Sequence, residues 1–245
     1  MTDKSILDLT EIMALSPNDY LVVETAIGTR KIKKGNAAIA GRKAPSIVQK
    51  ATLRGDGNVV LPSAPTVGNL LVHIAAGYSA TTLPATYRPT GFTPVQVYQS
   101  DVNNAVSLSI RRVQNGDGLN YAVTSQDNQA CVLFEFADAS GVYGIGGGAM
   151  GGFFSGSNFN AFAQLSPYSV DDIVIGAFTQ DTTALWNLTA ETGLTVDLVT
   201  PNDVNNHTGA FFHYDKTFDG SVQGSTSANP TQPAFGMFAV VGAPG

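Results

Sequence analysis

The sequence contains little cysteine and little charge. A single cysteine, Cys131, among 245 residues excludes an intramolecular disulfide, and its apolar run ACVLFEF indicates a small buried side chain. Charged residues make up 13% of the chain, about half of the usual share of roughly 25%. The surface must therefore rely on Ser, Thr, Asn, Gln and Gly, which is more typical of extracellular or particle-borne β proteins than of cytosolic enzymes.

A secretory signal and a membrane-spanning run are also missing from the sequence. The opening residues MTDKSILDLTEI lack a basic region followed by an apolar one. No uncharged apolar run approaches the roughly 18 residues that are needed to span a bilayer. We therefore expect a protein that is made in a cytoplasm without a signal peptide and that is not inserted into a membrane.

The charge that is present is unevenly distributed along the chain. Residues 1–54 hold 9 Lys and Arg against 5 Asp and Glu, whereas residues 55–245 hold 4 against 14. We expect the two parts to face different partners. The acidic part disfavours nucleic acid, because phosphate contacts need positive charge, and the basic part is short and has no interleaved aromatic residues.

From about residue 58 the sequence alternates between short strand-like runs and turns. At least nine such runs occur with no convincing long helix between them, among them NLLVHIAA, AVSLSIRRV, ACVLFEFAD, DIVIGAFT and AFGMFAVVG. This pattern predicts an all-β fold, an antiparallel β-sandwich of jelly-roll-like kind over residues 58–245. The segment 141–163 is rich in glycine and phenylalanine and predicts a long loop, either structural or functional.

The first 35 residues carry a separate, smaller pattern. The run Tyr20–Glu24 is strand-like, Gly28 permits a reversal, and TRKIKK follows, which predicts a β-hairpin with a helical or extended lead-in. Such a hairpin buries too little to be stable alone, so we expect residues 1–35 to dock on another protein. Residues 36–57 are small, basic and weakly patterned, which predicts a linker or short stalk without a coiled coil.

Signals for catalysis or for a cofactor are weak. The run GIGGGA resembles a nucleotide-binding loop, but the residues after it are not suited to start a helix. His207, His213 and Asp215 could in principle hold a metal, although no wider ligand spacing supports one. GxSxG is absent, and carboxylates for glycoside hydrolysis are available without a readable separation. We therefore predict no enzyme activity, cofactor or metal, and we expect His73 to be a strand residue with locally satisfied ring nitrogens.

Aromatic and acidic side chains near predicted loops point to a sugar site. Tyr168 and Trp186 could stack on the apolar faces of a sugar, and Asp181 and Asp203 could bind its hydroxyl groups. For each aromatic ring, packing in the core or at its rim is the alternative. As a set, these four residues are the candidate ligand-binding residues.

The phrase DLTEIMALSPNDYLVVETAIGTRKIKKGN resembles the N-terminal attachment segment of tailed-bacteriophage fibre and receptor-binding proteins. The pattern is carried by Leu7, Leu9, Asp19, Leu21, Val23, Gly28, Lys31 and Ile32. In addition, GNLLVHIAA, LSIRRVQNGDGLNYAVTSQ and ACVLFEFADASG are similar to β-sandwich domains of phage and secreted bacterial proteins. The resemblance implies a jelly-roll head, a homotrimer and no catalytic residues. It implies virion docking through Leu7, Leu9, Leu21, Val23, Lys31 and Ile32.

The residues and the resemblance together predict a bacteriophage virion structural protein of the tail-fibre or receptor-binding type. Its N-terminus would dock on a tail, baseplate or capsid protein, and its sandwich would contact the host surface through glycan. One alternative is a capsid decoration or head-fibre protein without receptor binding. A lesser alternative is a glycan depolymerase.

Overall fold

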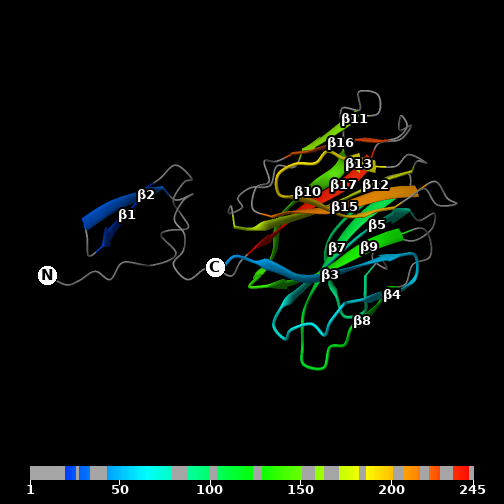
Figure 1. Ribbon diagram of the computed structural model, residues 1–245, viewed down its shortest axis with the longest axis horizontal. Helices are drawn as coiled ribbons and strands as arrows, with labels where there is room; N and C mark the ends of the chain where they lie inside the picture. Colours follow the sequence, from blue (N-terminus) through cyan, green and yellow to red (C-terminus); the bar gives the residue numbers. More distant parts are fainter. Residues whose placement is uncertain are drawn as a thin grey trace. The chain divides into compact units, whose positions relative to one another are not determined.

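The computed structural model describes most of the chain as β-strand (Figure 1). The described residues are 20–25, 28–33, 43–78, 88–99, 104–123, 129–150, 158–162, 171–181, 186–200, 207–215, 221–226 and 234–242. Within these ranges there are seventeen strands and no helix, so the described residues include no helix that could cross a membrane. Contacts divide the chain into two units, Met1–Arg42 and Lys43–Pro244.

The first unit contains the hairpin that the sequence predicts. Strands β1 (Tyr20–Thr25) and β2 (Gly28–Lys33) pair antiparallel, with Leu21 opposite Ile32. Val23 lies in β1 and Lys31 in β2, so four of the six predicted docking residues have a place in the hairpin backbone. The other two, Leu7 and Leu9, lie outside the described residues.

The second unit is built around two five-stranded antiparallel sheets. The strand order of the first sheet is β3-β9-β5-β7-β6, and that of the second is β10-β17-β12-β15-β14. The bounds in the first sheet are β3 Ser46–Arg54, β5 Leu70–Tyr78, β6 Thr93–Gln99, β7 Asn104–Arg112 and β9 Gln129–Ala137. Those in the second are β10 Gly141–Met150, β12 Ile173–Asp181, β14 Leu194–Val199, β15 His207–Asp215 and β17 Ala234–Gly242. Each sheet is thus made by one continuous half of the unit.

Two smaller antiparallel sheets complete the unit. One pairs β4 (Gly57–Val60) with β8 (Asn120–Val123), and the other has the order β11-β16-β13. The bounds of the latter are β11 Asn158–Phe162, β16 Ser221–Thr226 and β13 Trp186–Leu188. In Figure 1 these small sheets lie outside the two five-stranded sheets, one on each side of the sandwich.

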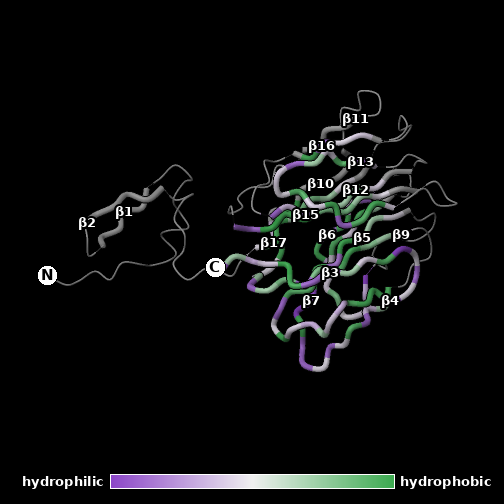
Figure 2. Tube along the Cα trace, in the orientation of Figure 1, coloured by the Kyte–Doolittle hydropathy of each residue, from purple (hydrophilic) through white to green (hydrophobic). Residues whose placement is uncertain are grey.

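Three hydrophobic clusters hold these layers together. The main core lies between the two five-stranded sheets and includes Val72, Phe134, Ile175, Phe211 and Ala239, none of them exposed. A second cluster lies where β13 and β16 cover the second sheet, and a third where β4 and β8 cover the first. Figure 2 shows the resulting concentration of hydrophobic residues along the central strands.

The covering layers explain why the central strands do not alternate between apolar and polar residues. An antiparallel strand with one solvated face alternates, whereas a strand that is covered on both faces needs apolar residues throughout. In β5, Leu70 and Val72 face the main core, while Leu71 and Ala75 belong to the third cluster. The predicted antiparallel sandwich is therefore confirmed, with additional layers that the sequence did not reveal.

Two predicted boundaries need correction. Residues 46–57, which fall in the predicted linker 36–57, contain β3 and the start of β4, and the sandwich unit begins at Lys43. The sequence did not predict β3 as a strand, because many of its side chains are polar and an edge strand needs few apolar residues. The predicted loop 141–163 contains β10 and β11, with residues 151–157 outside the description. Glycine is depleted in strands generally, so its abundance there pointed to a loop.

Candidate functional site

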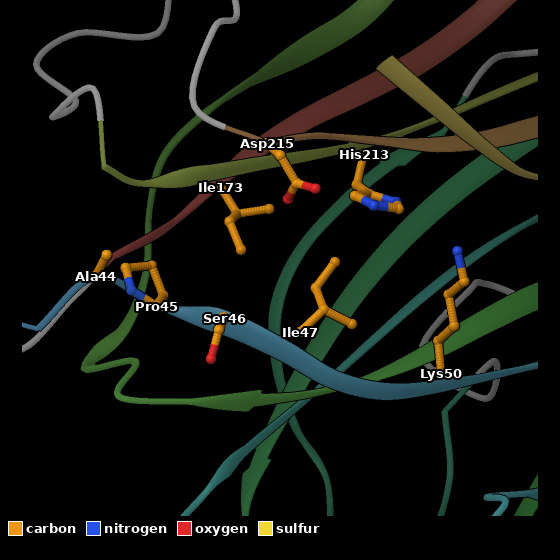
Figure 3. Close-up of a pocket in the computed structure, with 8 residues that line it drawn as sticks. All are labelled: Ala44, Pro45, Ser46, Ile47, Lys50, Ile173, His213 and Asp215. Atoms are coloured by element: carbon orange, nitrogen blue, oxygen red, sulfur yellow. The ribbon is translucent and has the colours of Figure 1, made fainter. Parts of the chain in front are cut away.

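A cavity of about 580 Å³ lies between the two sheets at one edge of the sandwich. Its lining comes from β3 and the residues just before it in the first sheet, and from β12 and β15 in the second. The lining residues are Ala44, Pro45, Ser46, Ile47, Lys50, Ile173, His213 and Asp215 (Figure 3). Its volume falls within the range of about 300–1,000 Å³ that is usual for small-molecule sites.

Two of the lining residues, Lys50 and His213, form a polar trio with Asp197. The carboxylate of Asp197 accepts hydrogen bonds from His213 Nδ1, at 2.9 and 3.0 Å, and from Lys50 Nζ. The Asp197 side chain is 0% exposed, that of His213 is 6% exposed and that of Lys50 is 37% exposed. A buried carboxylate is costly unless it is paired and hydrogen-bonded, and both conditions are met here.

The backbone places the three side chains from distant parts of the chain. Lys50 belongs to the edge strand β3, 147 positions before Asp197. Asp197 is the extra residue of a β-bulge in β14, between Val196 and Leu198, and it has no partner in the ladder with β15. Bulges redirect a side chain, and this one turns Asp197 toward His213 on the neighbouring strand.

The cavity combines an apolar floor with a polar rim. Figure 3 shows Ile47 and Ile173 pointing into the space between the strands, with Asp215 and His213 reaching in from β15. The Asp215 carboxylate offers a hydrogen-bonding group at the rim, whereas the Ser46 hydroxyl points away from Ile173 and Asp215 in Figure 3. A site of this kind suits a ligand that has both carbon-bound faces and hydroxyl groups.

Of the four candidate ligand-binding residues, Trp186 has a described side chain, and it does not line this cavity. Trp186 is 4% exposed and stacks on Phe178, with ring centroids 5.5 Å apart, so it packs in the second cluster as a core residue. Asp181 ends β12 opposite His207, and its side chain is not described. Tyr168 and Asp203 lie outside the described residues. For Trp186 the alternative of core packing is therefore the one that the structure favours.

His213 and Asp215 line the cavity together, as their spacing in a strand predicted. His213 Nδ1 is occupied by Asp197, and the side chain of His207 is not described. The described residues contain no group of three or more potential ligands that could hold a metal. The sequence did not predict that Lys50 and Asp197 meet, because they lie 147 positions apart and the alternation of LTVDLVT gives no sign of the bulge.

A second buried polar cluster surrounds Glu135 on β9, which is 0% exposed. Its carboxylate accepts hydrogen bonds from the side chains of Gln49 and Asn69 and from the backbone N–H of Thr66. Gln49 also bonds the backbone and hydroxyl of Ser63. Because these partners hold residues 63–69 onto the first sheet, we assign this cluster a structural role.

His73 and Cys131 are buried on the outer face of the first sheet. His73 Nδ1 lies 3.5 Å from Ser109 Oγ, whereas its Nε2 has no partner among the described residues. The expectation that both ring nitrogens are satisfied locally is therefore wrong for Nε2. Burial lowers the pKa of His73 to about 3. Cys131 is buried, which confirms the small buried side chain that its sequence context predicts, and burial raises the pKa of its thiol to about 12.

Comparisons of the chain with protein-family models, with curated proteins and with solved structures gave no match.

Proposed function

We propose that this protein is a phage virion structural protein of the receptor-binding type, whose sandwich binds a host glycan in the cavity beside Lys50, His213 and Asp215. The observation that carries the proposal is the cavity itself, with its apolar floor and its hydrogen-bonding rim. The resemblance of the N-terminal segment supports virion docking, assembly as a homotrimer and location in the virion. The division into two units fits a docking piece followed by a binding head.

A sugar matches the chemistry of this cavity. The carbon-bound hydrogens of a pyranose ring can lie against Ile47 and Ile173, and ring hydroxyls can bond to the Asp215 carboxylate. Carbohydrate binding needs both contributions, because an apolar wall alone leaves the hydroxyls without partners. The proposal includes no catalytic residues, so the expected activity is binding without cleavage.

The binding test uses the full chain and a panel of bacterial surface oligosaccharides, with affinity measured by titration calorimetry. We expect Asp215→Ala to weaken binding of the best ligand at least tenfold. Asp56→Ala, an exposed carboxylate in the turn between β3 and β4, is the matched control and should leave affinity unchanged. Equal affinity in wild type and Asp215→Ala, or binding to no glycan of the host, would contradict the proposal.

The docking test is electron cryo-microscopy of the particle that carries the protein. We expect residues 1–35 to be ordered against a tail, baseplate or capsid protein, with the sandwich projecting outward. Attachment to the capsid without glycan binding would replace the proposal with a decoration or head-fibre protein. Shortening of the glycan during incubation with the pure protein would replace it with a depolymerase.

A further inference from the structure

The two five-stranded sheets have the same topology. When the strands of each sheet are numbered by their order in the chain, both sheets have the spatial order 1-5-2-4-3. All neighbouring strands are antiparallel in both. Each sheet also has a strand between its first and second members that pairs with a strand between its fourth and fifth, namely β4 with β8 and β11 with β16.

The registers of the two sheets also correspond. In the pairing of strands two and four, Leu70 is opposite Arg112 in the first sheet and Ile173 is opposite Asp215 in the second. Both members of the second pair stand 103 positions after those of the first (70 to 173, 112 to 215). The other ends of these ladders, Tyr78 with Asn104 and Asp181 with His207, keep the same offset.

A one-residue bulge occupies the same place in the third strand of each sheet. In β6 the bulge leaves Val95 unpaired, opposite the step from Ser109 to Leu108. In β14 it leaves Asp197 unpaired, opposite the step from Phe212 to Phe211, and these two β15 residues again stand 103 positions after Ser109 and Leu108. Because bulges are specific local features of a strand, their coincidence indicates repetition of a whole unit rather than a shared general architecture.

We infer that the sandwich consists of two structural copies of one five-stranded unit, and that one of its two equivalent edges has become a polar site selective for uncharged sugars. The selectivity rests on the proposed function, whereas the repeat rests on topology and register alone. The edge at Lys50, Asp197 and His213 is named the polar seam. The equivalent edge at Val95, Ile110 and Ile145 is named the apolar seam.

The residues of the two seams correspond one to one. His213 stands 103 positions after Ile110, and each lies opposite the third residue of strand two, Ile175 or Val72. Asp197 and Val95 are the two bulge residues. Ile145 stands 95 positions after Lys50, which is the offset between the first residue pairs of strands one and five, Ser46 with Ala137 and Gly141 with Gly242. Lys50 pairs with Phe134, whereas Ile145 lies in the irregular step of the β10 ladder between Tyr143 and Gly146.

The apolar seam shows that the fold does not require the polar trio. Val95, Ile110 and Ile145 are partly buried and pack against the main core, where they close their edge by hydrophobic contact. A buried ion pair is often no more stabilising than hydrophobic residues of similar volume. The trio is therefore better explained by ligand binding than by folding.

The charges of the polar seam set the class of ligand. Lys50 and Asp197 neutralise one another, and Asp215 adds a negative charge at the cavity. A carboxylated sugar would place a like charge beside Asp215, which opposes binding, whereas an uncharged sugar meets only hydrogen-bonding groups. The polar seam therefore favours neutral hexose units over uronic or sialic acids.

The decisive experiment gives the polar seam the residues of the apolar seam in one variant, Lys50→Ile/Asp197→Val/His213→Ile. We expect this full-length variant to fold with a Tm at or above that of wild type and to lose glycan affinity at least tenfold. Unfolding, or a Tm lower than that of the single Asp197→Val variant, would overturn the equivalence of the seams. Retained affinity would overturn the ligand role of the trio.

Selectivity is measured with neutral and uronic-acid-containing oligosaccharides of equal length. We expect wild type to prefer the neutral series at least tenfold and Asp215→Asn to narrow that preference. A preference for the acidic series would overturn the ligand class. If wild type binds neither series, the proposed function fails, while the Tm of the triple variant still tests the equivalence of the two seams.

Discussion

The two seams of the sandwich occupy equivalent positions and use opposite chemistry. At one edge Val95, Ile110 and Ile145 extend the main core. At the other, a fully buried Asp197 binds His213 and Lys50. Equivalent strand positions are thus closed by hydrophobic contact at one edge and by an ion pair at the other. The backbone geometry of the seams therefore depends on strand register and bulges, and not on the side chains between the strands.

A second pair of equivalent positions lies on the outer faces of the sheets. In the first sheet His73 is opposite Ser109, and 103 positions later Gly176 is opposite Phe212. The larger side chain of each pair is His73, on the second strand of the first sheet, and Phe212, on the fourth strand of the second sheet. Because interiors are close-packed, the exchange keeps the volume of the pair while changing its chemistry.

The largest effect is expected when one partner of the polar seam is removed. Asp197→Ala leaves the Lys50 ammonium and the buried His213 ring without their acceptor, and we expect a loss of about 3 kcal/mol in the free energy of unfolding. Val95→Ala, the equivalent change in the apolar seam, removes part of a half-buried side chain and should cost about 1 kcal/mol.

Denaturant unfolding of both variants and wild type in one buffer gives this comparison. Circular dichroism should first show that each variant keeps the β spectrum of wild type. Equal losses in the two variants would mean that the carboxylate contributes no more than packing, and the contrast between the seams would then be confined to ligand binding.

A smaller effect is expected when the volume of one outer pair is increased. A Cβ on Gly176 would overlap the ring of Phe212, which is fixed among Phe178, Tyr214 and Phe238. We expect Gly176→Ala to lower the free energy of unfolding by about 2 kcal/mol through overpacking. Gly118→Ala is the control, because a Cβ there meets nothing within 4 Å. Equal stability of the two variants in thermal unfolding would show that the Phe212 ring can move aside.

At the other outer pair, His73 with Ser109, we expect acid to lower the free energy of unfolding. Burial lowers the pKa of His73 from 6.5 to about 3, so between these values the unfolded chain binds a proton that the folded chain does not. Stability therefore falls as the pH falls below about 6.5, by up to about 1.4 kcal/mol per pH unit. From pH 7 to pH 5 we expect wild type to lose about 2 kcal/mol more than His73→Leu. Parallel losses in the two proteins would assign the acid sensitivity to other groups.

The sequence was sufficient for the class of fold and for the hairpin, and it was insufficient for the site. Strand-like runs such as ACVLFEF and NLLVHIAA predict buried strands directly. The polar seam depends on a bulge at Asp197 and on a contact with Lys50 from a distant edge strand, and neither leaves a local pattern. Trp186 is the single tryptophan and suggested a ligand site, yet it lies on the covering strand β13 and packs against Phe178 of the second sheet.

The repeat was hidden for a similar reason. Equivalent positions carry different residues, such as His73 and Gly176 or Lys50 and Ile145, because each copy needs only the right total volume at each contact. Register and strand order are properties of the pairing between strands, so they become visible only when the sheets are assembled.

The smallest effect is expected for an ion pair of the same type that lies on the surface. Lys43 Nζ is 3.8 Å from Asp138 Oδ1, and the two side chains are 76% and 40% exposed. Water screens this pair, so Lys43→Ala should change the free energy of unfolding by less than about 0.5 kcal/mol, against about 3 kcal/mol for Asp197→Ala. Urea titrations at low and high salt measure the difference. A change for Lys43→Ala as large as that for Asp197→Ala would mean that ion pairing alone, without burial, sets the strength of the polar seam.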